Sequence, residues 1–153
     1  MPNRIPPKID LAAYANEHLR YEAWMFVEAH QHLPVTRPGS FEMNAMVESC
    51  LFHFRNLLDF FYPRVLRVDD VIAADYVPDW DSKRPALSSV LETARKRVDK
   101  ELAHLTTQRI SGAPPQKMWD FGTVSLELQP VIETFIRVAH GLSVEAVAVL
   151  RAI

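Results

Sequence analysis

The chain has 153 residues, of which 48% are hydrophobic and 24% are charged, and its formal net charge is −2. This length suits one ordinary domain, and the composition is that of a globular protein, which excludes disordered and fibrous classes. The small negative charge argues against a protein that wraps nucleic acid electrostatically, so RNA binding would need a local basic patch. We therefore expect a single domain over residues 1–153.

Two further features bear on location. The N-terminal sequence MPNRIPPKID lacks the apolar run of a signal peptide, and no window approaches the roughly 18 apolar residues of a membrane span. The single cysteine, Cys50, lies among apolar residues and is interpreted as a small buried side chain, which is compatible with a reducing compartment. The sequence therefore predicts a cytoplasmic protein with no membrane partner.

Two long helices are predicted in the first part of the chain. The first covers about Ile9–His32 and stops before Pro34. Ser40 is the expected N-cap of the second, about Phe41–Tyr62, which ends at Pro63. In the second helix one apolar stripe follows the helical period, namely Met43, Val47, Cys50, Leu51, Phe54, Leu57, Leu58 and Phe61.

An acidic linker, PRVLRVDDVIAADYVPDWDSKRP, follows and is expected to hold one short helical turn near Asp69-Asp70. A third long helix is predicted to begin near Pro85 and to end at SGAPP, residues 111–115. Its apolar stripe consists of Leu87, Val90, Leu91, Ala94, Val98, Leu102 and Leu105.

The fourth helical region is predicted over about Gln116–His140, with Pro130 either kinking it or starting a new helix. Gly141 reads as a C-cap, and Ser143 as the N-cap of a short last helix, VEAVAVLRA. Four long helices with mostly short connections predict an all-α fold, a four-to-five-helix bundle with one long acidic inter-helix linker.

The stretch LFHFRNLLDFF, residues 51–61, combines a strongly apolar character with His53, Arg55, Asn56 and Asp59. A helix that is apolar nearly all round is central in a bundle or faces a second chain, so these polar groups must find partners. Arg55 and Asp59 have the i, i+4 spacing of a pair within the helix. Alternatively, all four converge with polar groups of the third helix into a site. The second apolar side, which carries Phe52, is expected to form a homodimer.

The third helix carries Arg97 and His104 seven residues apart, with Glu101 between them on nearly the same flank. A guanidinium that neutralises phosphate and an imidazole that moves a proton suit phosphodiester chemistry. The alternative is a solvated flank without function. Nearby Arg95, Lys96 and Lys100 spread around the helix and are interpreted as a solubilising surface.

These motifs resemble the HEPN superfamily, all-helical domains that carry an Arg-polar dipeptide or an Arg-x4-6-His motif on a long internal helix. Arg97 to His104 has the permitted spacing, with Val98 where that family prefers a polar residue. Arg55-Asn56 has the dipeptide, but Phe60, Phe61 and Tyr62 stand where the histidine is expected. The resemblance implies a metal-independent ribonuclease whose site is assembled across a dimer. It also implies that His104 acts as general base on a ribose 2′-hydroxyl, that Arg97 or Arg55 holds the phosphate, and that Asn56 orients it.

Other chemistries find less support. A metal site from His53, His104 and Asp59 or Asp75 is not demanded by their spacing, and the linker aspartates are explained by caps and turns. No Gly-rich phosphate loop, GxSxG elbow or CxxC pair occurs, so we expect no metal and no cofactor. The aromatic residues Tyr76, Trp80 and Trp119 are interpreted as core or interface residues.

Two functional hypotheses follow. In the first, the protein is a non-catalytic helical module that binds a partner protein or a small ligand. In the second, it is a HEPN-like ribonuclease or RNA-binding protein. The candidate catalytic residues are Arg97, His104, Arg55 and Asn56, and the candidate binding residues are His53, Asp59 and Arg109.

Overall fold

The computed structural model describes residues 7–102, 107 and 118–153, and within these residues the fold is all-α, with no strand. In chain order the elements are α1 (Leu11–Tyr14), η1 (Ala15–Leu19), α2 (Arg20–His32), η2 (Leu33–Val35), α3 (Phe41–Phe61), α4 (Ala73–Tyr76), α5 (Trp80–Lys83), α6 (Ser89–Arg97), η3 (Val98–Leu102), α7 (Phe121–Val138) and α8 (Val144–Arg151). The predicted fold class is confirmed. Within the same residues, no helix is both long enough and apolar enough to span a membrane.

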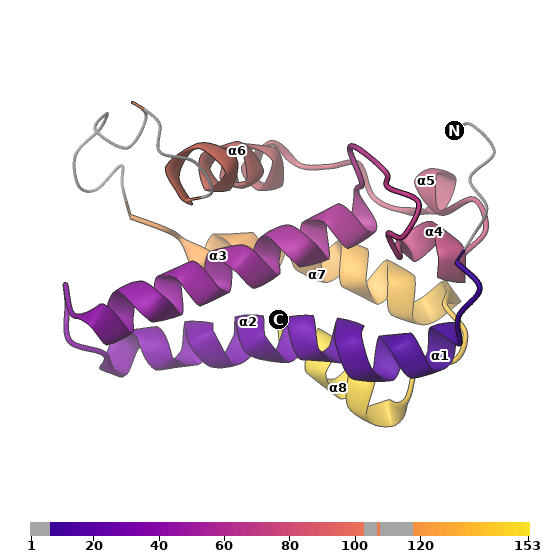
Figure 1. Ribbon diagram of the computed structural model, residues 1–153, viewed down its shortest axis with the longest axis horizontal. Coiled ribbons are helices and arrows are strands. Elements are labelled where there is room, and N and C mark those ends of the chain that lie inside the picture. The colour runs from indigo at the N-terminus through magenta and orange to yellow at the C-terminus, as the bar shows by residue number, and fades with distance from the viewer. Residues whose placement is uncertain (1–6, 103–106, 108–117) are drawn as a thin grey trace.

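The elements α1, η1 and α2 follow one another without a break and form one N-terminal helix, in which η1 is a π-helical stretch. It begins two residues after the predicted start, because Asp10 is extended and its carboxylate accepts a hydrogen bond from the Ala13 N–H at 3.0 Å. The N-terminal helix and α3 pack side by side, joined at one end by η2 and a short turn (Figure 1).

Helix α3 is central, as the sequence predicts. Ser40 caps it, with its hydroxyl oxygen accepting from the Met43 N–H at 3.1 Å, and the helix ends one residue before Tyr62. In Figure 1, α2 lies along one side of α3, α6 covers another, and α7 passes behind it. Its buried residues occur on most of its circumference, namely Cys50, Leu51, His53, Phe54, Leu57, Leu58, Phe60 and Phe61.

The linker differs from its prediction. No helical turn starts at Asp69-Asp70; instead the Asp70 carboxylate accepts from the Arg67 N–H at 2.7 Å and closes a turn. The short helices α4 and α5 come later. Asp75 supports the start of α4 by accepting from the Ile72 N–H at 2.9 Å. Asp70 and Asp75 thus each bind local backbone, whereas Asp81 pairs with Arg84 at 2.7 Å.

The third predicted helix also starts later than expected. It begins at Ser89, because the Ser88 hydroxyl accepts from the Leu91 N–H at 3.2 Å, whereas Pro85 lies in an extended segment whose carbonyl accepts the Tyr62 hydroxyl at 2.8 Å. Helix α6 continues through the π-helical η3 to Leu102. The predicted end at residues 111–115 lies outside the described residues.

Helix α7 runs through Pro130 without interruption, so Pro130 does not start a new helix. The proline is exposed, and water can therefore reach the carbonyl that its missing N–H leaves unpaired. The helix begins at Phe121, behind the Asp120 cap, later than the predicted Gln116, which is outside the described residues. Ser143 caps α8 as predicted. The C-cap of α7 is Ala139, in extended conformation, and not the predicted Gly141, which lies two residues further on with φ of +82°.

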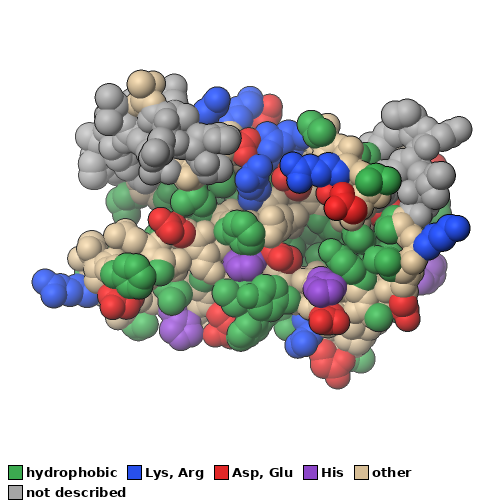
Figure 2. Space-filling model, in the orientation of Figure 1, with side chains coloured by type: hydrophobic (Ala, Val, Ile, Leu, Met, Phe, Trp, Pro, Cys, Tyr) green, Lys and Arg blue, Asp and Glu red, His purple; other side chains and the backbone are tan. Residues whose placement is uncertain are grey.

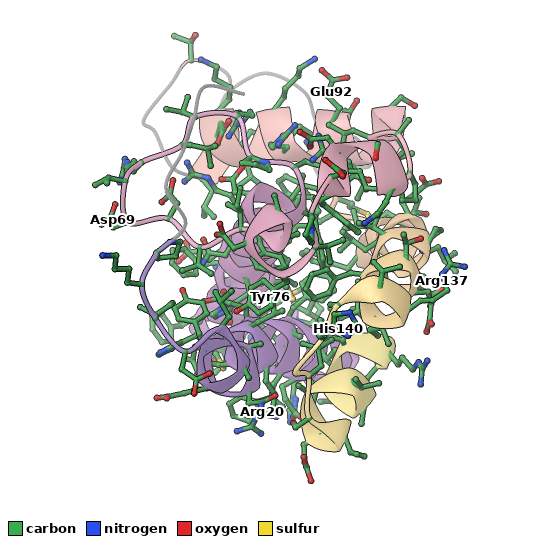
Figure 3. All side chains as sticks on the ribbon, turned by 90° about the vertical axis from the view of Figure 1, so that its right-hand side faces the viewer. Arg20, Asp69, Tyr76, Glu92, Arg137 and His140 are labelled. Atoms are coloured by element: carbon green, nitrogen blue, oxygen red, sulfur yellow. The ribbon has the colours of Figure 1, made fainter. Side chains whose placement is uncertain are left out.

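The buried hydrophobic side chains form one cluster that extends from Ala15 to Ile153. Aromatic rings fill the part of the core between α3, α4, α5 and α7. The centre of the Phe135 ring lies 5.4 to 5.8 Å from the ring centres of Phe60, Phe61, Tyr76 and Trp80. Figure 3 shows Tyr76 in the interior, whereas Asp69, Glu92 and Arg137 lie at the outside. The interpretation of Tyr76 and Trp80 as core residues is confirmed, and so is the burial of Cys50.

Candidate functional site

An open cleft of about 730 Å³ lies between the N-terminal helix, the second half of α3 and the linker segment 63–72. On the face drawn in Figure 2, acidic, basic and histidine side chains lie close together beside hydrophobic ones. The polar residues that line the cleft are Tyr14, His18, Glu22, Arg55, Asn56, Asp59, Arg64, Arg67, Asp69 and Asp70. Three of the residues singled out from the sequence, Arg55, Asn56 and Asp59, thus share one cleft.

A hydrogen-bonded group connects the two long helices at the cleft wall. Glu22 Oε2 lies 2.7 Å from His53 Nδ1 and accepts from Asn56 Nδ2 at 2.9 Å. The His53 side chain is only 7% exposed, and the rings of Tyr21 and Phe52 pack against it edge-on. Because one carboxylate oxygen binds both partners, the Glu22 side chain has a defined orientation. The same oxygen gives the buried His53 ring a hydrogen-bond partner.

Sequence reasoning selected His53 and Asn56 but missed Glu22. One signal was present, since Glu22 is the only charged residue in the run from Tyr21 to Val27. A lone charge in an apolar helical segment needs a partner, by the same reasoning that was applied to residues 51–61.

A second polar group, the arginine-aspartate cluster, joins α3 to the α6–η3 helix. Asp59 lies 3.8 Å from Arg55, 3.8 Å from Arg64 and 3.7 Å from Arg95. Asp99 lies 3.4 Å from Arg55 and 2.7 Å from Arg64. Arg55 thus pairs with Asp59 within α3 and also meets Asp99 of the third helix, whereas His53 and Asn56 are hydrogen-bonded to Glu22 of the N-terminal helix.

The pKa values of the two carboxylates of this cluster are shifted in opposite directions. Burial raises the pKa of Asp59 above its usual value, and the nearby Arg64, Arg55 and Arg95 offset this only in part. Burial also acts on Asp99, but the hydrogen bond from Arg64 and the charges of the three arginines outweigh it and lower its pKa. Asp99 is thus the better-satisfied anion of the pair.

Arg95 corrects one interpretation of the sequence. It was assigned to a solubilising surface, but its side chain is only 8% exposed, and it donates to the Tyr62 carbonyl at 2.8 Å. Burial lowers the pKa of Arg95, as does the neighbouring charge of Arg64. Lys96 is an exposed partner of Glu92, as a solubilising residue should be. The third helix thus supplies Arg95 and Asp99 to the cluster, neither of which sequence reasoning selected.

Arg97 is engaged elsewhere. Its guanidinium forms two hydrogen bonds of 3.0 Å with the Glu101 carboxylate, donates to the Met118 carbonyl, and lies 3.9 Å from the centre of the Trp119 ring. Arg97 does not line the cleft, so the structure does not bring it together with Arg55. The other two candidates of this region, His104 and Arg109, lie outside the described residues.

Two atoms of the cluster are left without hydrogen bonds. Arg55 Nε and Asp59 Oδ1 are both buried, yet each has only the longer ion contacts given above among the described residues. Within the same part of the chain, no group of three or more His, Cys, Asp or Glu side chains is arranged to hold a metal ion. The hydrogen-bonding capacity of the cleft thus exceeds what the fold uses.

Comparison of the chain with family models, with curated proteins and with solved structures finds no match in any of the three. The chemistry of the site therefore has to be inferred from its own geometry.

Proposed function

We propose that this protein is a non-catalytic helical module that binds a small polar ligand in the cleft between the N-terminal helix, α3 and the linker. The observation that carries this proposal is the position of Arg55. It belongs to the cluster that ties α3 to the third helix, and its side chain is also 39% exposed at the cleft.

The dimensions and the lining of the cleft support this function. About 730 Å³ falls within the range of roughly 300–1,000 Å³ that is typical of small-molecule sites. Glu22 and Asn56 are held by hydrogen bonds across two helices, so the cleft wall is organised before any ligand arrives. A wall organised in this way lowers the ordering cost of binding.

Thermal unfolding in the presence of single compounds tests this proposal. Amino acids, amino sugars, nucleotides and small carboxylates are added one at a time to wild type, to Arg55→Met and to a matched control, Arg151→Met. Arg151 is an exposed partner of Glu133 outside the cleft. At least one compound should raise the midpoint of wild type and of the control, with a smaller rise in Arg55→Met. The absence of any saturable rise in wild type would refute the proposal.

A second candidate is the HEPN-like ribonuclease or RNA-binding protein. The observation in its favour is that Arg55 and Asn56, the Arg-polar dipeptide, both line the open cleft. Because Arg97 is held by Glu101, the phosphate-binding role that the resemblance implies is assigned to Arg55, with His104 as general base. End-labelled RNA in the presence of a chelator should then be cut by wild type and spared by His104→Ala and Arg55→Met. Uncut RNA with wild type would exclude the ribonuclease.

The expected homodimer is also proposed, with the aromatic patch formed by Tyr21, Trp24 and Phe52 as its seam. These side chains are 47%, 45% and 54% exposed, and the rings of Tyr21 and Phe52 both contact His53. The patch therefore lies directly beside the Glu22 wall of the cleft. A second chain seated there would shield His53 and its bond to Glu22 from water.

A further inference from the structure

The cleft is lined by charged side chains of both signs. Three arginines and four carboxylates line it, so the lining carries no large excess of either sign. A polyanion would favour a lining rich in cations only. The positions of the individual charges are therefore more informative than their sum.

The end of the cleft at the N-terminal helix is acidic. Glu22 uses Oε2 for both His53 and Asn56, and Oε1 makes no hydrogen bond to any other described residue. The hydroxyl of Tyr14, about two helical turns before Glu22 on the same helix and in the same cleft lining, likewise has no hydrogen-bond partner in the described part of the chain. The Tyr14 ring lies tilted against that of His18, with 4.7 Å between the ring centres. Burial raises the pKa of Tyr14, and the negative charges of Glu22 and Asp70 raise it further.

The end at the second half of α3 is basic. In the arginine-aspartate cluster three guanidinium groups, those of Arg55, Arg64 and Arg95, face the two carboxylates of Asp59 and Asp99, which leaves one positive charge uncompensated. Arg55 makes only ion contacts of 3.4 and 3.8 Å and donates no hydrogen bond to a described residue. Apart from the buried Nε, the donors of this 39% exposed side chain are thus available to an anion in the cleft, and guanidinium groups bind carboxylate and phosphate through paired hydrogen bonds.

We propose that the ligand of the cleft is a zwitterion, whose ammonium group is bound by Glu22 and Tyr14 and whose carboxylate or phosphate is bound by Arg55 and Arg64. This inference rests on the proposed ligand-binding function and specifies the class of ligand. Glu22 is then the specificity-determining residue, since it separates a zwitterion from a simple anion, and buried His53 and Asn56 are positioning residues that act through its carboxylate.

Isothermal titration calorimetry with defined probes tests the zwitterion. The zwitterions are 4-aminobutanoate, 6-aminohexanoate and phosphoethanolamine, and the counterparts that carry charge of one sign only are butylamine, hexylamine, hexanoate and methyl phosphate. At least one zwitterion should bind about tenfold or more tightly than the counterparts of one sign, because each end contributes a charge-assisted hydrogen bond. Comparison of the aminoalkanoates with phosphoethanolamine distinguishes a carboxylate from a phosphate.

Two variants assign the ammonium end. Glu22→Gln keeps the size of the side chain and should reduce zwitterion affinity to that of the simple anion, while hexanoate or methyl phosphate binds as to wild type. Tyr14→Phe, which removes one hydroxyl and no helix contact, should shift affinity in the same direction by a smaller factor and guards against misfolding of the first variant. Circular dichroism confirms that both variants are helical.

Three results would overturn the proposal of a zwitterionic ligand: equal affinity for zwitterions and for probes with charge of one sign, no binding of any probe, or equal losses for anion and zwitterion in Glu22→Gln. The first and third leave the ligand-binding function standing, provided that Arg55→Met weakens binding. If neither these probes nor the compounds of the thermal screen bind to wild type, the ligand-binding function fails as well.

Discussion

The two sides of the second half of α3 differ in what they contact. On one side Phe60 and Phe61 meet the rings of Trp80 and Phe135, and the Trp80 Nε1 donates to the Phe61 carbonyl at 2.9 Å. On the other side Arg55 and Asp59 meet arginines and a carboxylate at the edge of an open cleft. The buried aromatic layer and the charged cluster thus lie on different sides of the same part of α3, since Asp59 directly precedes Phe60.

This difference indicates that the two sides of α3 have different roles, one in stability and the other in the cleft. Burial of aromatic rings contributes non-directional stability in proportion to area, with a further contribution from edge-on ring pairs. On the charged side, the cost of removing charged groups from water has to be offset by well-placed ion pairs and hydrogen bonds. Asp59 Oδ1 is buried without a hydrogen bond, so this cost is only partly offset. Changes on the aromatic side should therefore affect folding most, and changes on the charged side should affect the cleft.

Phe135→Ala is expected to reduce the free energy of unfolding more than any other variant proposed. Phe135 is fully buried and touches four aromatic rings, so its removal leaves a large cavity that the surrounding rings cannot fill. The free energy of unfolding, measured in urea, should fall by about 3–5 kcal/mol. The control Phe52→Ala changes an exposed ring of the same type, and the loss there should be about 0.5 kcal/mol or less in the monomer. Similar losses in the two variants would contradict the assignment of Phe135 to the core.

Arg95→Met tests the charged side of α3 away from the cleft. The substitution leaves the Tyr62 carbonyl without its donor and takes one cation from Asp59, so the free energy of unfolding should fall by about 1–3 kcal/mol. Lys96→Met, at the adjacent exposed position, should leave the urea midpoint close to that of wild type. If Arg95→Met were as stable as wild type, Arg95 would be a surface residue, as the sequence first suggested.

The local signals of the sequence were sufficient for most of the helices. The caps at Ser40 and Ser143 follow from residue types next to apolar stripes, and the structure contains both. The start of α6 had a local signal of the same kind, since Ser88 is its N-cap, but the prediction placed the start at Pro85. The contact of Pro85 with the hydroxyl of Tyr62, a residue 23 positions away, could not be read from local propensity.

The sequence predicted the α3 residues of the candidate site but not their partners. The apolar context of residues 51–61 was enough to select His53, Arg55, Asn56 and Asp59 as side chains in need of partners, and the structure gives each of them at least one. The partners themselves, Glu22, Arg95 and Asp99, are 31 to 44 positions away and depend on how the helices pack. Their spacing in the sequence shows no pattern, so no periodicity argument could have found them.

The pH dependence of stability separates the two carboxylates of the cluster. Asp99 has a lowered pKa, so its contribution to the free energy of unfolding is fully present above the ordinary aspartate pKa of 3.8 and is lost as the pH falls from there through the lowered pKa of the folded state. Asp59 has a raised pKa, so the folded state binds its proton more tightly, and stability falls as the pH rises through that pKa. The two groups oppose each other.

Urea unfolding between about pH 2 and pH 6 measures both contributions. Relative to wild type, Asp99→Asn should lose progressively more stability as the pH rises towards neutrality. Asp59→Asn should instead gain relative stability with rising pH, since it removes a buried charge that the folded state tolerates poorly. Parallel curves for the two variants would show that the arginines serve both carboxylates equally.

Phe52→Ser has the smallest expected effect on the stability of the monomer and is aimed at the proposed homodimer. Phe52 is on the same helix as Phe60 and Phe61 but is 54% exposed, so its ring contributes little to the monomer core. Light scattering after size-exclusion chromatography should give the mass of two chains for wild type and of one chain for the variant, with unchanged circular dichroism. Because the aromatic patch adjoins the Glu22 wall, the variant should also bind the cleft ligand more weakly once it is monomeric. A wild-type protein that stays monomeric at every concentration would refute the proposed homodimer. The exposed rings would then be available to a different partner protein.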